Sequence, residues 1–247
     1  MNADPAAQLR LLDLQAVDTV LAQLVHRRGR LPELADIARA DERLAELQAD
    51  TVRAETEVSD LDREQKRVDR DVEQVRTRAQ RDRGRMDSGS VGSAKELESL
   101  QHEVATLARR QSTLEDQELE VMERREESES RLAEVRAEAE RVGAERAEAV
   151  GRRDTAYEQI DAETARHDAE RTSLVVDIPE ALLTLYEKVR AQAGGTGAAA
   201  LRARRCEGCR LELAGTELTA ARNAAPDLVL RCEECRRILV RTPDSGL

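Results

Sequence analysis

A seven-residue repeat of apolar residues constrains this chain more than any other feature of its sequence. Between Ile37 and Asp82, eleven of the fourteen a and d positions are apolar, and the positions between them are mainly charged. A repeat sustained this long buries its stripe against a second helix and winds into a left-handed coiled coil. An isolated helix is excluded, because its apolar stripe would stay in water.

A second heptad array follows a glycine-rich turn. The turn is predicted near 83–93, where three glycines fall within ten residues. Ser93 and Glu96 then form a capping box that restarts the helix, and the apolar repeat continues to Ile160 in a helix that runs to about Thr172. Two arrays joined by a short turn predict a long antiparallel coiled-coil hairpin, and hence a mainly α fold.

Matching side chains across the seam predicts the register of this hairpin. The best match sets Val58 opposite Val121 and Thr51 opposite Ser128, so that a polar layer fixes the alignment. Arg125 also falls on the seam. We expect it to extend its guanidinium into water, as long basic side chains commonly do.

Shorter helices are predicted on both sides of the hairpin. Asp4-Pro5 is a helix start, and Gly29 to Pro32 should interrupt the helix that follows. A bend at Pro179 leads to a short helix that carries Tyr186. We expect this helix, the first helix and the end of the long helix to form a three-helix base. The predicted domains are 1–193 for the helical hairpin with its base, 194–200 for a flexible glycine-rich hinge, and 201–247 for a small C4 zinc ribbon.

The only four cysteines lie in the C-terminal region as two C-x-x-C pairs: Cys206, Cys209, Cys232 and Cys235. This spacing predicts one tetrahedral zinc ion held by four thiolates, a closed and therefore structural site. Gly208, within the first pair, suits a backbone position of positive φ. The second pair has no glycine at the equivalent position. Two disulfides are disfavoured because no signal peptide opens the chain. The spacing alone fits iron as well as zinc.

Composition and charge exclude several classes of function. The chain has no Phe or Trp and two Tyr, and its net charge is −11, which argues against a general nucleic-acid-binding protein. No apolar run reaches the ~20 residues that span a membrane. No phosphate-binding loop is present, and the histidines lie far from any nucleophile. We therefore expect a cytoplasmic protein without catalytic residues or a small-molecule substrate.

Five sequence stretches resemble a bacterial family of coiled-coil proteins with a C-terminal C4-type zinc ribbon: SAKELESLQHEVATL, LEDQELEVME, IPEALLTLYEKVR, CEGCRLEL and CEECRRILV. The resemblance covers essentially the whole chain. It implies a long hairpin with a ribbon, the metal role for the four cysteines, and no catalytic residues. Some relatives are linked to the sigma-54 class of sigma factors, to flagellar or type III secretion components, and to RNA. Glu234 stands where the second pair often has glycine.

The whole chain favours a non-enzymatic adaptor or chaperone-like scaffold that binds protein partners through its coiled coil and ribbon. Leu119 and Met122, which lie off the main seam, are candidate contacts, although they could instead thicken the seam. The alternative function is RNA or DNA binding by the ribbon, because phosphate contacts need arginines. Pairing of these arginines with neighbouring glutamates is an equally good interpretation. The candidate contacts for nucleic acid or a partner are Arg202, Arg204, Arg205, Arg210, Arg236 and Arg237.

Overall fold

Five helices account for most of the chain in the computed structural model, which describes residues 1–247. The chain divides into two units, one formed by 35–149 and the other by 1–34 together with 150–247. None of the helices has an apolar stretch that could cross a membrane. The helices are α1 (Pro5–Arg28), α2 (Pro32–Asp87), α3 (Ala94–Val176), α4 (Glu180–Gln192) and α5 (Gly215–Asn223).

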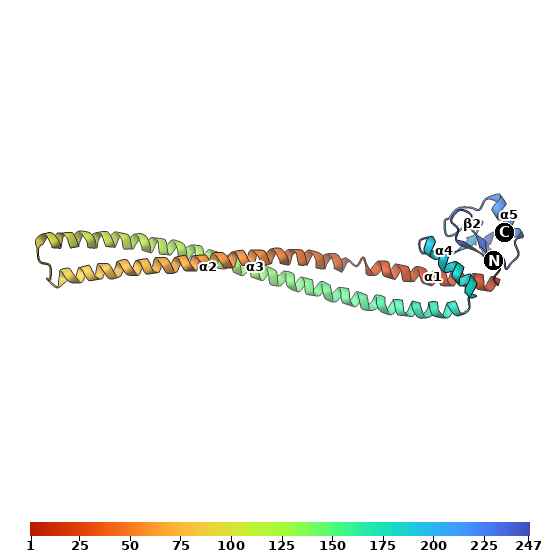
Figure 1. Cartoon of the computed structure of the whole chain (residues 1–247), viewed down its shortest axis with the longest axis horizontal. Coiled ribbons are helices and arrows are strands. Elements are labelled where there is room, and N and C mark those ends of the chain that lie inside the picture. The colour runs from red at the N-terminus through yellow and green to blue at the C-terminus, as the bar shows by residue number, and fades with distance from the viewer. The chain divides into compact units, whose positions relative to one another are not determined.

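The unit 35–149 is the predicted antiparallel hairpin, in which α2 and α3 run side by side (Figure 1). Its buried residues recur at intervals of seven on both helices, as a left-handed coiled coil requires. This confirms the mainly α fold with a long coiled-coil hairpin. The heptad-spaced buried residues are Leu47, Ala54, Leu61 and Val68 in α2, and Leu114, Val121 and Ser128 in α3.

The turn of the hairpin is shorter than predicted, because α2 continues to Asp87. The capping box predicted for the start of α3 is only half formed, because Glu96 reaches back to Gly92 and not to the N-cap residue Ser93. The Ser93 hydroxyl accepts a hydrogen bond from the Glu96 N–H at 3.2 Å, and the Glu96 carboxylate accepts one from the Gly92 N–H at 3.2 Å. These bonds satisfy N–H groups that have no partner within the helix.

The predicted register of the hairpin is wrong. It would place Gln65 opposite Leu114, but Gln65 accepts a hydrogen bond from Arg125 Nη1 at 2.6 Å. Glu55 likewise pairs with Arg136 at 2.6 Å, further along α3 than predicted. Apolar matching treated Gln65 and Arg125 as separate defects of the seam. Placing them together costs less, because each then supplies the hydrogen bond that the other loses on leaving water.

In the other unit, α1, the end of α3 and α4 pack together as the expected base. Pro32 starts α2 after a break, and a bend at Pro179 precedes α4, both as predicted. The same hydrophobic core also includes strand residues of the ribbon. Its buried members include Leu11, Leu14, Leu182, Tyr186, Ala198, Ile238 and Val240. The ribbon and the helical base of this unit therefore share one core.

The ribbon contains a four-stranded sheet with the order β2-β1-β4-β3. Strands β1 and β4 pair in parallel and the outer pairs are antiparallel. The Ala-rich sequence of β1 has low strand propensity. Pairing with β4 and burial against the core outweigh that propensity. The strands are β1 (Ala198–Arg202), β2 (Arg205–Cys206), β3 (Leu230–Arg231) and β4 (Ile238–Arg241), followed by the short 3-10 helix η1 (Pro243–Ser245).

The segment 194–200, predicted as a flexible hinge, is packed against α1 and α4. Gln15 Oε1 accepts a hydrogen bond from the Gly197 N–H at 2.6 Å, and Gln15 Nε2 donates to the Gly195 carbonyl at 3.1 Å. A Cβ at Gly197 would lie 2.7 Å from the ring of Tyr186, so only glycine fits there. This packing concerns the predicted flexibility of the segment. The domain boundary at 194–200 stays a prediction from sequence.

Candidate metal centre and neighbouring arginines

The two cysteine pairs lie on two turns that have the same hydrogen bonds. In the first turn the Cys206 N–H donates to the Leu211 carbonyl at 3.0 Å, and the Arg210 N–H donates to the Cys206 carbonyl at 2.6 Å. Both bonds close a tight turn that points the two cysteine side chains the same way. The second turn repeats them, with Cys232, Arg237 and Arg236 in the equivalent places at 3.0 and 2.9 Å.

The four sulfur atoms are placed for a single tetrahedral metal ion. All four lie within 4.8 Å of one another, and the Cys206–Cys235 and Cys209–Cys232 sulfur distances are both 3.8 Å. Zinc–sulfur bonds of about 2.3 Å in a tetrahedron give sulfur–sulfur edges of about 3.8 Å. A disulfide needs roughly 2.05 Å, and all four cysteines are free. The arrangement fits one structural zinc ion and leaves no coordination position open.

The backbone around the sulfurs favours their charged form. N–H groups of Gly208 and Cys209 are directed at the Cys206 sulfur, but burial is the larger effect and raises the pKa of this thiol to about 12. For Cys235, burial also acts upward, yet hydrogen bonds from the Arg237 backbone and guanidinium bring the pKa to about 7. A cation that replaces the thiol protons removes the cost of these buried charges.

Gly208 does not have the positive φ predicted for it. The left-handed backbone in each turn falls one residue after the second cysteine, at Arg210 with φ 63° and Arg236 with φ 64°. Gly208 is required for space, because a Cβ there would lie 2.7 Å from Arg237 Cδ and 3.0 Å from Ala199 Cβ. Glu234 therefore carries no penalty for replacing glycine in the second turn.

The structure separates the six candidate arginines into two groups. Arg237 is partly buried, and its guanidinium donates to the carbonyls of Ala193, Thr196 and Gly208 at 2.9, 3.2 and 3.3 Å. It therefore ties the first cysteine turn to the end of α4, and is a structural residue. The other five are exposed and make no ion pair with any acidic residue: Arg202, Arg204, Arg205, Arg210 and Arg236.

A buried carboxylate in the helical base was missed by sequence reasoning. Asp18 is 1% exposed; it accepts hydrogen bonds from Arg171 at 2.7 Å and from the Tyr186 hydroxyl at 2.6 Å. Arg190 lies 3.3 Å from its second oxygen. Burial, followed by the hydrogen bond to Asp18, raises the pKa of Tyr186. Asp18 follows Leu14 by four residues, which puts it on the apolar face of α1. That position was the signal available in the sequence.

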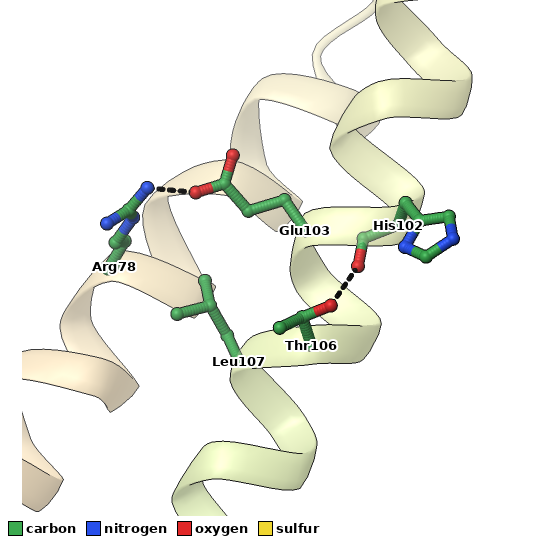
Figure 2. A pocket seen from close by; sticks show the side chains of 5 residues that line it. All are labelled: Arg78, His102, Glu103, Thr106 and Leu107. Carbon is green, nitrogen blue, oxygen red and sulfur yellow. Dashed lines mark hydrogen bonds and ion pairs between the residues drawn. The ribbon is translucent and has the colours of Figure 1, made fainter.

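The hairpin carries shallow surface hollows. One of about 380 Å³ is lined by Arg78, His102, Glu103, Thr106 and Leu107. Figure 2 shows that the His102 ring points away from the Arg78–Glu103 ion pair, and no serine, cysteine or lysine lines the hollow. The groups do not converge on one point, as catalysis would require.

Comparison with known proteins agrees with this geometry. A sequence model described as the CT398-like coiled coil hairpin domain matches residues 14–194, and a C4-type zinc ribbon domain matches 205–239. The chain belongs to the CT398-like coiled-coil hairpin family. The second match covers all four cysteines of the metal centre.

Relatives of this CT398-like chain share its full length. An uncharacterized protein of Mycobacterium tuberculosis is 39% identical, with 98% of both chains covered. A solved structure from Mycobacterium smegmatis is 36% identical, with a TM-score of 0.86 over 98% of this chain and 100% of that one. CT398 from Chlamydia trachomatis is 19% identical, with a TM-score of 0.68 over 96% and 98% of the chains, which shows the shared fold.

Proposed function

We propose that this protein is a non-enzymatic adaptor or chaperone-like scaffold that binds protein partners. The observation that carries the proposal is the exposure of Leu119 and Met122 on α3. Their exposed fractions are 59% and 36%, so they do not thicken the seam. Three residues apart on a helix, they share one face. Val52 on α2 is similarly exposed at 57%. Apolar side chains on a helix face are typical anchors for a partner helix.

The closed metal centre and the dispersed polar groups support a binding role rather than catalysis. A zinc ion with four sulfur ligands offers no position for water or substrate. We place the protein in the cytoplasm, where thiols stay reduced. Free cysteines 3.8 Å apart are consistent with that setting.

A photo-crosslinking experiment in the native host tests this proposal. A photoreactive residue at position 119 of the full chain should trap a discrete protein partner. The same residue at exposed Glu120, which lies on a different side of α3 from Leu119 and Met122, serves as the control position. The Met122→Ser variant should reduce trapping at 119 several-fold. Equal trapping at both positions, or none at either, would contradict the proposal.

Nucleic-acid binding by the ribbon is the second candidate, supported by the five exposed arginines without ion pairs. Its test is an electrophoretic shift with mixed RNA and DNA at ~150 mM salt, because contacts with several phosphates weaken steeply with salt. A shift that survives this salt and is lost in Arg204→Glu/Arg205→Glu supports this candidate. No shift at that salt rejects it.

A further inference from the structure

The turn between β1 and β2 holds its arginines at a cost in stability. Arg202 and Arg205 face each other directly across the two strands, and like charges in this position repel. The two residues between them, Ala203 and Arg204, both have positive φ, at 45° and 63°. Such a turn normally takes Asn or Gly, because L-residues with a side chain are strained at positive φ. Stability alone does not account for this sequence, and unfavourable local features of this kind often mark functional sites.

Nothing in the chain neutralises these charges. Arg202, Arg205 and Arg210 have no acidic partner within ion-pairing distance, although Glu207 and Glu212 are close in sequence. The pairing with glutamates that the sequence allowed is therefore absent. The Arg204 side chain makes one hydrogen bond, from its Nε to the Gly246 carbonyl at 3.3 Å. The guanidinium groups keep most of their donors for a ligand.

An exposed leucine lies on the segment that follows the first cysteine turn. Leu211 is 51% exposed, and its carbonyl is fixed by the Cys206 N–H at 3.0 Å. The next residue, Glu212, forms an isolated β-bridge with Arg205. The leucine is therefore close to the arginines, on a backbone that the cysteine turn holds in place.

We propose that Arg202, Arg204, Arg205, Arg210 and Leu211, the arginine surface, bind a short acidic segment of a partner protein that carries an apolar residue. Guanidinium groups pair with carboxylates through two parallel hydrogen bonds, and Leu211 contacts the apolar side chain. This surface rests on the proposed protein-binding function but is separate in sequence from Leu119 and Met122.

Two observations favour a peptide over nucleic acid at this surface. Both tyrosines of the chain, Tyr157 and Tyr186, lie outside 201–247, so the ribbon has no aromatic ring on which a base could stack. An exposed leucine adds nothing to phosphate binding, whereas it complements an apolar side chain.

The test is fluorescence anisotropy on the full-length, zinc-loaded chain. The probes are a labelled twelve-residue peptide of Asp and Glu with two leucines, the same peptide with serines for leucines, and a twelve-nucleotide RNA. We expect the leucine peptide to bind most tightly at 150 mM salt, and Arg202→Glu/Arg205→Glu to weaken it at least tenfold. Leu211→Ser should reduce its affinity to that of the serine peptide.

The matched control is Arg30→Glu/Arg222→Glu, which makes the same charge change at two exposed positions, one after α1 and one in α5; it should alter the affinity less than twofold. Zinc content and circular dichroism confirm that each variant is folded. Equal weakening by the Arg30/Arg222 and Arg202/Arg205 variants, or tighter binding of the RNA than of either peptide, overturns the proposal. Peptide binding in a Leu119→Ser/Met122→Ser chain shows that the arginine surface acts independently of the hairpin contacts.

Discussion

Replacing Gly197 with alanine tests how tightly the ribbon packs on the helical base. The new Cβ would lie 2.7 Å from Cδ2, Cε2 and the carbonyl oxygen of Tyr186. The Tyr186 side chain is fully buried and its hydroxyl is bound to Asp18 at 2.6 Å, so neither ring nor backbone can yield freely. Overpacking of this kind costs about 1–3 kcal/mol, and we expect the upper end.

A smaller effect opposes this loss. Alanine restricts the unfolded chain more than glycine does and returns about 0.4–1 kcal/mol. The net prediction for Gly197→Ala is a loss of about 2 kcal/mol in the free energy of unfolding. Urea titration followed by tyrosine fluorescence measures it, because Tyr157 and Tyr186 are the only aromatic residues.

Gly151→Ala is the matched control, because no atom lies within 4 Å of a Cβ at this helical position. It should be neutral or stabilise the protein by up to about 1 kcal/mol, the usual gain from alanine in a helix. A Gly197→Ala protein as stable as the wild type would show that the 194–197 segment is loose. The shared core of base and ribbon would then be wrong.

Three further changes test other parts of the structure. Asp18→Asn should cost about 2–3 kcal/mol of unfolding free energy, which is less than for a fully buried pair because its arginine partners are about a quarter exposed. The control Asp13→Asn, at an exposed position, should cost under about 0.5 kcal/mol in the same urea titration. Equal effects of the two substitutions would count against the buried network. A double-mutant cycle of Gln65→Ala and Arg125→Ala should give a coupling energy of about 1 kcal/mol in thermal unfolding, whereas zero coupling would favour the register predicted from sequence. Gly208→Ala should displace the Arg237 side chain and speed zinc loss to a chelator several-fold, and an unchanged rate would refute the close approach at this glycine.

The hairpin, the Ser93 cap of its second helix and the cysteine set were predictable because each depends on local spacing. The geometry of heptads, turn glycines and C-x-x-C pairs is determined by residues that lie close together in the sequence. The register was not predictable in this way. It depends on Gln65 meeting Arg125 across the two helices, 60 residues apart, and apolar matching gives no weight to such a pair.

The relation of the ribbon to the base was also hidden from sequence reasoning. Glycines at 194–197 indicate flexibility when read alone, but Gly197 is small so that it can pack against Tyr186. Similarly, Arg237 looks like its exposed neighbour Arg236, and only its three carbonyl partners show that it is structural. In each case the contact partner is distant in sequence, and a single chain carries no local signal of it.

Metal analysis of the purified native protein tests the central claim most directly. Four sulfurs within 4.8 Å of one another should hold one zinc per chain. Mass spectrometry under non-denaturing conditions should show a single zinc ion, and Cys206→Ser/Cys232→Ser should abolish it. A wild-type chain that carries no metal, or iron in place of zinc, would contradict this account.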